Sequence, residues 1–414
     1  MEKALLVTVK VESEKDNWPL EDAAYELEEL AVTSGAEVVN SITCTCDRPA
    51  ANLFIGSGKA DEIAFLCQAD DIETVIFSHD LSGTQQRNLE EAVGRKVIDR
   101  TQLILDIFAR HAKSPEGKAQ VELAQLEYLL PRLTGKGVVL SRLGGGIGTR
   151  GPGEQKLETD RRRIRKRIDR LKEDLQRLML HRHTVRKRRQ ENSAACVALV
   201  GYTNAGKSTL INALTNADQR VQDSLFTTLD PVSKGIRLPN GENIVLSDTV
   251  GFLQNLPHNL IEAFKATLEE VVEADLLIHV LDVSHPRFYE HSRAVSSVLQ
   301  EIGAADKPLI TALNKIDLMD DKIWLNRLSA DFPEAVCISA KSGQNLEELL
   351  NSIQKKFEGR MALVEVVIPH TQMGLVDLIY REGRVESVKY LAEGIQVKAR
   401  LPKTAVEKYL KGII

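Results

Sequence analysis

The hydrophobic pattern of residues 1–112 alternates between two periods. Strand-like apolar runs cover residues 4–11, 37–43 and 74–77, whereas residues 20–30 carry apolar side chains at helical spacing and residues 84–94 form a polar helical segment. Strand periods that alternate with helix periods are typical of an α/β domain. We therefore predict a small N-terminal α/β domain over residues 1–112.

The period changes between residues 115 and 189. Two runs of apolar residues recur at spacings of 4 and 3, and these are Ala119, Leu123, Leu126, Leu130 and Leu133, then Ile164, Ile168, Leu171, Leu175 and Leu178. Two heptad seams separated by a loop predict an antiparallel helical hairpin over residues 113–191. Pro131 lies near the end of the first seam, where a proline should bend or end the helix.

The loop of this hairpin is rich in glycine, with the sequence RLGGGIGTRGPGE at residues 142–154. GIGTRG matches the dinucleotide-binding spacing GxGxxG, which requires a preceding strand, a following helix and second strand, and an acid about 20 residues later. Here Pro152 follows the last glycine, a long basic helix comes next, and the acid at that distance, Glu173, lies among arginines. We interpret the glycines as a pliable tip and not as a nucleotide site.

The remaining chain predicts two further domains. Strand-like runs at residues 196–200, 243–247 and 276–281 alternate with helical segments, which indicates a doubly wound, mostly parallel sheet over residues 192–360. Residues 361–414 contain the strand-like VEVVIP, the amphipathic VDLIYREG, the paired strand-like SVKYLAEGIQVKARL and a short final helix. This pattern predicts a small C-terminal α+β domain without a recognisable site.

The composition restricts the cellular compartment that we expect for the protein and the kinds of site that it can contain. At 414 residues, with 43% hydrophobic and 27% charged residues, the chain is expected to form several globular domains. It lacks an apolar run of about 18 residues and a signal-peptide pattern at its start, so we expect a cytoplasmic protein, and we expect a monomer. Its five cysteines are scattered without zinc-site spacing, and GSGK at residues 56–59 lacks the first glycine of a phosphate loop.

Charge is distributed unevenly along the chain. The net charge is −5, yet residues 161–189 contain fourteen Lys or Arg residues against three acids. A basic element on an acidic protein is often a nucleic-acid contact surface, although it can also be a solvated helix face of a hairpin that merely packs on its own protein.

The segment CVALVGYTNAGKST carries the most specific motif. GYTNAGKS at residues 201–208 has the spacing GxxxxGK[ST], follows a strand-like run and opens a helix-compatible run. In such a loop, backbone amides surround phosphates, Lys207 neutralises the β and γ oxygens, and the Ser208 hydroxyl binds Mg²⁺. We therefore predict a nucleoside-triphosphate site with Mg²⁺ as cofactor.

Later motifs identify the γ-phosphate contacts and the base. In LSDTVGF, Asp248 can hold a water on Mg²⁺ and the Gly251 amide can contact the γ-phosphate. In NKID, Asp317 can accept hydrogen bonds from N1 and N2 of guanine while Asn314 supports the loop, and the Ala340 amide of SAK can donate to O6. Adenine has neither this donor pair nor O6, and polar mismatches discriminate by roughly 10⁴ to 10⁵. The motifs thus predict a GTPase.

Two features govern hydrolysis. The loop SLFTTLDPVSKG should contain a threonine that binds Mg²⁺ and the γ-phosphate, and spacing alone leaves Thr227 and Thr228 as alternatives. Phe252 follows Gly251, where many GTPases place the glutamine that orients the attacking water, and an aromatic ring cannot do so. We predict slow hydrolysis by the protein alone and stimulation by a partner of about 10³ to 10⁵.

Taken together, the motifs resemble those of the HflX family of translation-associated GTPases. The similarity includes GYTNAGKST, FTTLDP, DTVGF, NKID and SAKSG, and the segment GIGTRGPGEQKLETDRRR resembles the family's GxGxGExxxExDRR. The resemblance covers essentially the whole chain and assigns the switch role to Thr228, although the family usually has Ala at the position of Thr227. It implies GTP-dependent binding to the large ribosomal subunit, including its RNA, and splitting of stalled or idle ribosomes.

The predicted catalytic residues are Lys207, Thr228 and Gly251, and the predicted metal ligands are Ser208, Thr228 and, through water, Asp248. The predicted GTP and GDP contacts are Gly201, Tyr202, Thr203, Asn204, Ala205, Gly206, Lys207, Ser208, Thr209, Phe226, Thr227, Thr228, Leu229, Asp230, Asp248, Thr249, Val250, Gly251, Asn314, Lys315, Ile316, Asp317, Ser339, Ala340 and Lys341. The RNA-contact candidates are Arg142, Gly146, Gly148, Arg150, Gly151, Arg161, Arg162 and Arg163. Alternative hypotheses are a ribosome-assembly or RNA-modification GTPase without splitting activity, and an ATP-driven RNA remodeller, for which no second phosphate loop is found.

Overall fold

The computed structural model describes residues 2–13, 18–133, 152–191, 195–215, 226, 232–254, 265–319, 328, 331–332 and 334–410. The chain divides into two compact units. The first contains Met1–Leu178 together with Phe226, and the second contains most of the residues from Met179 onward.

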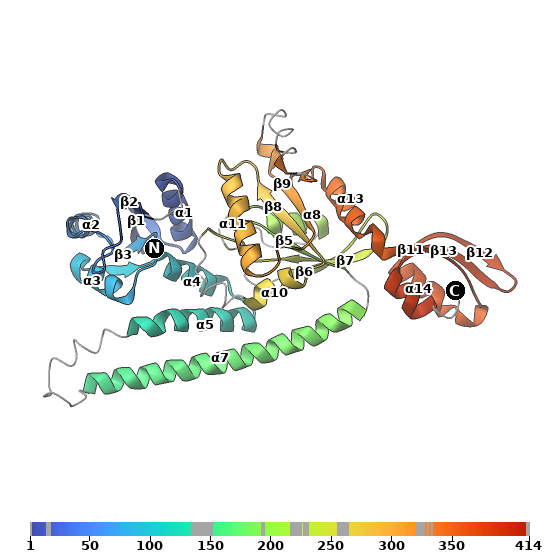
Figure 1. Ribbon diagram of the computed structural model, residues 1–414, viewed down its shortest axis with the longest axis horizontal. Helices are drawn as coiled ribbons and strands as arrows, with labels where there is room; N and C mark the ends of the chain where they lie inside the picture. Colours follow the sequence, from blue (N-terminus) through green and yellow to red (C-terminus); the bar gives the residue numbers. More distant parts are fainter. Residues whose placement is uncertain are drawn as a thin grey trace. The chain divides into compact units, whose positions relative to one another are not determined.

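The N-terminal domain is a parallel four-stranded sheet with helices on both faces (Figure 1). Its strands lie in the order β2-β1-β3-β4, and their bounds are β1 (Lys3–Val11), β2 (Glu37–Cys46), β3 (Thr74–Phe77) and β4 (Lys96–Ile98). Helices α1 (Leu20–Thr33) and α4 (Arg100–His111) pack together, as do α2 (Ser57–Ala69) and α3 (Gly83–Val93). Alternate residues of β1, including Leu5 and Val7, join Ile63 and Leu89 in one core. The predicted α/β fold is confirmed.

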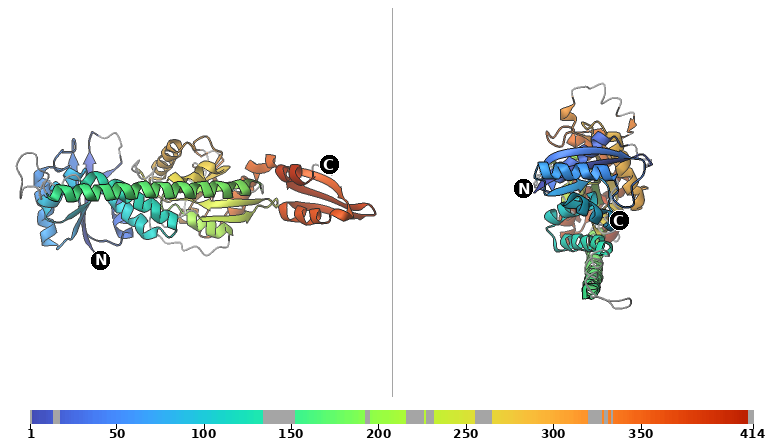
Figure 2. Two further views of the ribbon diagram at one scale, coloured as in Figure 1. Left: turned by 90° about the horizontal axis from the view of Figure 1, so that it is seen from below. Right: turned by 90° about the vertical axis from the view of Figure 1, so that its left-hand side faces the viewer.

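The predicted seam of the hairpin is present. Helix α5 (Pro115–Arg132) ends one residue after Pro131, and α7 (Pro152–Glu191) is a single helix of 40 residues (Figure 2). Leu123 of α5 is buried with Ile168, Leu171 and Leu175 of α7. Eight of the ten predicted seam residues form or pack against this cluster, whereas Leu133 does not belong to it, because α5 ends at Arg132, and Leu178 is exposed.

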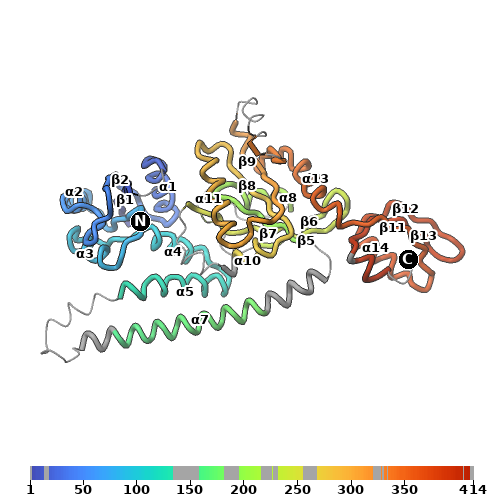
Figure 3. Tube along the Cα trace, in the orientation of Figure 1, coloured from blue at the N-terminus to red at the C-terminus, as the bar shows by residue number. Residues whose placement is uncertain are grey.

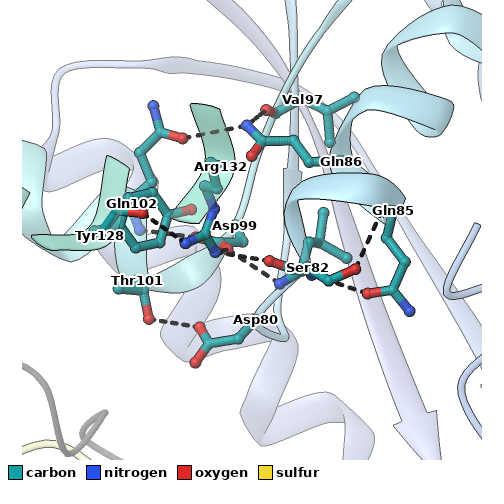
Figure 4. Close-up of polar contacts among 11 residues, drawn as sticks. Asp80, Ser82, Gln85, Gln86, Val97, Asp99, Thr101, Gln102, Tyr128 and Arg132 are labelled. Carbon is teal, nitrogen blue, oxygen red and sulfur yellow. Dashed lines mark hydrogen bonds and ion pairs between the residues drawn. The ribbon is translucent and has the colours of Figure 1, made fainter. Parts of the chain in front are cut away.

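The end of α5 is anchored on the N-terminal sheet (Figure 4). Arg132 donates hydrogen bonds to the carbonyl of Leu81 at 2.7 Å and to Asp99 Oδ2 at 3.0 Å. Its guanidinium carbon lies 3.4 Å from the centre of the Tyr128 ring. Asp99 is fully buried and also caps α4 by accepting from the amide of Gln102 at 2.9 Å. Arg132 thus fixes the end of α5 to the carboxyl edge of the sheet.

The second unit contains a six-stranded sheet in the order β10-β9-β8-β5-β7-β6. The strands are β5 (Ala195–Val200), β6 (Val232–Arg237), β7 (Asn243–Asp248), β8 (Leu276–Asp282), β9 (Leu309–Asn314) and β10 (Val336–Cys337). The associated helices are α8 (Lys207–Thr215), α10 (Lys265–Glu273), α11 (Phe288–Glu301), η2 (Ile316–Leu318) and α13 (Leu346–Phe357). Only the β6–β7 pair among these described strands is antiparallel, so the predicted mostly parallel sheet is confirmed.

The C-terminal domain is an antiparallel sheet with one main helix (Figure 3). Strands β11 (Met361–Ile368), β12 (Arg384–Leu391) and β13 (Gly394–Pro402) lie in the order β11-β13-β12, and α14 (Gly374–Glu382) packs on them. The chain then continues through α15 (Lys403–Ala405) and η5 (Val406–Leu410). The predicted α+β character is confirmed. This domain is hydrogen-bonded to the β6–β7 turn, because Arg384 donates to the carbonyl of Pro239 at 3.2 Å.

The described residues contain neither a membrane-spanning helix nor a cluster of metal-binding side chains. None of the helices in these ranges is long and apolar enough to cross a membrane. The same ranges contain no group of three or more His, Cys, Asp or Glu residues placed to hold a metal ion, and all five cysteines are free thiols.

Candidate functional site

The phosphate loop connects β5 to α8 and requires glycine at two positions. A Cβ on Gly201 would lie 2.3 Å from the carbonyl oxygen of Val280, and a Cβ on Gly206 would lie 2.3 Å from Asn314 Nδ2. Gly206 also has a φ of +95°, which is strained for a residue with a side chain. The glycines therefore let the loop approach β8 and β9 more closely than other residues could.

Lys207 is the first residue of α8 and is buried beneath the loop. Its Nζ donates to the carbonyl of Gly201 at 3.1 Å and to that of Tyr202 at 2.8 Å. Burial lowers the pKa of Lys207 to about 8, although the carboxylate of Asp248 opposes this shift. A nucleotide phosphate would oppose it further, so the site is prepared to bind an anion.

Ser208 and Asp248 meet where α8 begins and β7 ends. The Ser208 hydroxyl donates to Asp248 Oδ2 at 2.7 Å, and Asp248 is fully buried. A hydroxyl and a carboxylate that converge beside a buried lysine are oxygen ligands of the kind that Mg²⁺ prefers. These residues fit the predicted cofactor. Thr228, the third predicted ligand, lies outside the described residues.

Asn314 joins the phosphate loop to the predicted base-binding motifs. Its Nδ2 donates to the carbonyl of Ala205 at 2.8 Å, and its Oδ1 accepts from the amide of Ala340 at 2.9 Å. With 2% of its surface exposed, Asn314 is almost fully buried. The Ala340 amide, predicted to contact O6 of guanine, is thus held by Asn314 here. One side chain sets the spacing of three motifs that are far apart in the sequence.

Lys315 and Asp317 follow Asn314 at the end of β9. Lys315 has a φ of +65°, and its Nζ forms an ion pair with Asp282 Oδ2 at 2.7 Å. Asp317 lies in the short helix η2. Sequence reasoning missed Asp282, although its place after the apolar run of β8, at the carboxyl end of a predicted parallel strand, was an available signal.

The segment after β7 is bonded to the phosphate loop through backbone groups. The amide of Phe252 donates to the carbonyl of Gly201 at 3.1 Å, and the amide of Thr203 donates to the carbonyl of Phe252 at 2.9 Å. The Thr249 hydroxyl donates to the carbonyl of Leu199 at 2.5 Å. Phe252 is 1% exposed, so its ring is part of the core. Gly251 is consequently held beside the phosphate loop.

Tyr202 adds a side-chain contact to this arrangement. Its hydroxyl accepts a hydrogen bond from the amide of Gln254 at 3.1 Å. Its ring stacks on His291 of α11, with centroids 3.8 Å apart and an angle of 6° between the planes. Burial, with a smaller effect from His285, lowers the pKa of His291 to about 3, so the histidine stacks as a neutral ring. Sequence reasoning did not predict this stack, because His291 belongs to no motif.

Other predicted site residues fall into four groups. Outside the described residues lie Thr227, Thr228, Leu229, Asp230, Arg142, Gly146, Gly148, Arg150 and Gly151. Phe226 is described and packs edge-on against Phe108 of α4, with ring centroids 4.6 Å apart. Arg162 and Arg163 are exposed on α7, and Arg161 is partly exposed. The remaining predicted nucleotide contacts belong to the loops and elements of the six-stranded sheet described above.

This arrangement can bind a nucleoside triphosphate and transfer its γ-phosphoryl group. Loop amides and Lys207 are the groups that can contact phosphates, Ser208 and Asp248 can hold Mg²⁺, and Gly251 is adjacent to Lys207. Asn314 places the NKID and SAK segments at the carboxyl edge of the sheet, where ligands bind in such folds.

Protein-family models match nearly the whole chain. Residues 21–109 match "GTP-binding GTPase N-terminal", residues 111–189 match "GTP-binding GTPase Middle Region", and residues 196–315 match "50S ribosome-binding GTPase". Residues 325–409 match "HflX C-terminal domain".

Similar proteins of full length are known. The chain is 46% identical over 413 residues to GTPase HflX of Caldanaerobacter subterraneus subsp. tengcongensis, covering 100% of this chain and 94% of that one. It is 41% identical to GTPase HflX of Escherichia coli K12, covering 97% and 94%. Among solved structures, a GTP-binding protein from Sulfolobus solfataricus in complex with GDP is 26% identical, with a TM-score of 0.45, covering 86% of this chain and 98% of that one.

Proposed function

Because the chain belongs to the HflX family and is a GTP hydrolase, we propose that its GTP form binds the large ribosomal subunit and splits stalled or idle ribosomes. Hydrolysis to GDP and phosphate then releases the protein. Matching of residues 196–315 to a model described as "50S ribosome-binding GTPase" supports the choice of partner. We also propose that the protein acts in the cytoplasm as a monomer.

The exposed basic surface of α7 is the observation that carries this proposal. Its apolar residues face α5, so its opposite side is free to carry charge. We define the α7 basic surface as four exposed cations that form no ion pair with any described carboxylate, namely Arg162, Arg165, Lys166 and Arg170. Unpaired arginine and lysine on a rigid helix are suited to RNA phosphates.

In the proposed mechanism, some motifs contact the γ-phosphate that is transferred and others recognise the guanine base. Lys207 neutralises the β and γ oxygens, and the Gly251 amide donates to the γ-phosphate. Ser208, Thr228 and, through water, Asp248 would hold Mg²⁺, which would supply positive charge to neutralise the phosphate oxygens. Asp317 accepts from N1 and N2 of guanine, which excludes adenine. Because Phe252 cannot orient water, turnover is slow until the ribosome acts on the switch region.

The experiment is light scattering of intact ribosomes mixed with the protein and a non-hydrolysable GTP analogue. We expect scattering to fall as subunits separate, with no fall when GDP replaces the analogue. A variant with Arg165, Lys166 and Arg170 changed to Gln should split ribosomes at least tenfold more slowly while binding GTP normally. The matched control is Arg177→Gln, because Arg177 is exposed on the same helix but lies near Asp174 at 3.9 Å.

Two outcomes would contradict the proposal. If ribosomes stay intact while the protein binds free large subunits or their precursors, the assembly-factor alternative is favoured. If the triple variant splits ribosomes at the wild-type rate, the α7 basic surface is only a solvated helix face. Binding through phosphates also predicts that affinity for large subunits falls by about 10³ or more between 50 and 200 mM salt.

A further inference from the structure

Phe252 leaves the hydrolysis site without a side chain that can hydrogen-bond water at that position. Its backbone is bonded to Gly201 and Thr203, and its ring is 1% exposed. Rotation of this segment would break two backbone hydrogen bonds and expose an aromatic ring, so Phe252 is fixed in place. A group that positions the attacking water must therefore come from another residue.

Thr203, in the phosphate loop, has a buried side-chain hydroxyl that makes no hydrogen bond to any described residue. The residue is 6% exposed, and within the described part of the chain its buried Oγ1 has no hydrogen-bond partner. A buried unpaired hydroxyl costs about 1 to 3 kcal/mol and is rare in folded proteins. Its backbone amide already donates to the carbonyl of Phe252. The hydroxyl is thus the donor that residue 203 has available for a ligand.

The position of Thr203 points to the γ-phosphate. A Cβ built on Gly251 would lie 2.8 Å from both Cα and Cγ2 of Thr203, and 3.1 Å from Nζ of Lys207. Thr203 and Lys207 therefore both lie against Gly251, with the Cγ2 methyl of Thr203 nearest to it. Lys207 and the Gly251 amide are the groups that contact the γ-phosphate in phosphate-loop GTPases.

We propose that Thr203 is a catalytic residue whose hydroxyl positions the attacking water in place of the absent glutamine. Its oxygen accepts a hydrogen bond from the water, and its O–H donates to a γ-phosphate oxygen. The water oxygen forms a bond to the γ-phosphorus as the bond to the β–γ bridging oxygen breaks. GDP leaves with that electron pair, and the water proton passes to the phosphate, so Thr203 is unchanged after turnover.

The test uses the full chain with Thr203→Val and Thr203→Ser. Valine keeps the shape of threonine and removes the hydroxyl, whereas serine keeps the hydroxyl and removes a methyl group. For Thr203→Val we expect kcat for GTP to fall about 10²-fold, which is typical for the loss of one preorganised hydrogen-bonding group, with KM changed less than about threefold. Thr203→Ser should retain kcat within about fivefold.

A second readout does not depend on turnover. Aluminium fluoride with GDP mimics the planar γ-phosphoryl group, and Thr203→Val should weaken binding of this mimic by at least tenfold while leaving the Kd for GDP unchanged. Equal binding of the mimic by wild type and Thr203→Val would overturn the proposal, and so would a Thr203→Ser variant as slow as Thr203→Val.

Thermal stability separates this role from a structural one. Because Oγ1 has no partner among the described residues, Thr203→Val should keep or raise the Tm of the nucleotide-free protein. The contrast is Thr249→Val, which removes the hydrogen bond to Leu199 and should lower Tm. If Thr203→Val lowers Tm as much as Thr249→Val, the hydroxyl is a structural group and the proposal is wrong.

Discussion

Replacing Asn314 with alanine should weaken nucleotide binding and lower the free energy of unfolding of the protein. The change removes both hydrogen bonds of the side chain, at 2.8 Å to Ala205 and at 2.9 Å from Ala340. Ala205 is 1% exposed and Ala340 is 4% exposed, so their backbone groups lose partners that water cannot easily replace. Each unpaired buried group costs about 1 to 3 kcal/mol, so the sum is about 2 to 6 kcal/mol.

The cost should divide between stability and binding. Guanidinium chloride denaturation of the nucleotide-free protein should show a loss of about 2 to 4 kcal/mol, because some water enters the space of the lost amide. Titration with a fluorescent GDP analogue should show an affinity at least tenfold weaker, since the phosphate loop and the SAK segment are no longer held at a fixed spacing. Asn314 contributes to binding through organisation of the site.

Asn243→Ala is the matched control, because it removes an amide of the same size from the same sheet. Asn243 is exposed and donates to the carbonyl of Arg381 at 3.3 Å, so its loss should cost less than about 0.5 kcal/mol. The reasoning is refuted if Asn314→Ala is no more destabilising than Asn243→Ala. An Asn314→Ala protein with wild-type affinity for GDP would refute the organising role by itself.

Three further predictions concern Gly206, His279 and Arg132. Gly206→Ala should weaken GTP binding at least tenfold in an equilibrium titration, whereas Gly303→Ala, which has a similar positive φ but open space around its Cβ, should not. Burial lowers the pKa of His279 to about 4, so below pH 6.5 the unfolded chain binds a proton that the folded protein does not bind. Denaturation curves should therefore show that the free energy of unfolding falls by about 3 kcal/mol between pH 7 and pH 4. A His279→Leu variant should lose less over the same range. Arg132→Met should destabilise the N-terminal unit by about 3 to 5 kcal/mol because Asp99 stays buried without its cation, and Asp99→Asn in the same chain should restore part of this in thermal melts; no restoration would contradict the ion-pair argument.

Local pattern was sufficient for the helices and strands that have a strong period. The seam residues of α5 and α7 were predicted from spacing alone, since a helix packed along one face needs apolar residues every three to four positions. β8 was predicted from its run LLIHVL, because a short continuous run that is mostly apolar is typical of a strand buried on both faces. The three-residue strand β4 was not predicted, because it is too short to show a period. Helix α4, which follows it, was not predicted either.

The motifs predicted a set of nucleotide-binding residues, but not what holds those residues in place. Asn314 was expected to support its loop, yet its bonds to Ala205 and Ala340 depend on how the strands of the sheet are ordered. The stack of Tyr202 on His291 and the ion pair of Lys315 with Asp282 are tertiary contacts between segments with no shared spacing. Such contacts follow from topology, which a residue pattern does not contain.

The geometry also restricts where a stimulating partner can act. Lys207 is bonded to loop carbonyls, Asn314 holds the base motifs, and Phe252 is bonded to the phosphate loop. Because these bonds within the protein organise the base and phosphate motifs, reorganising the base pocket would add little to the effect of a partner. Its effect must fall on the γ-phosphate side, beside Gly251 and Thr203. Stimulation by ribosomes should therefore raise kcat for GTP and leave the affinity for GDP nearly unchanged, and a partner that changed both equally would be acting on the phosphate loop itself.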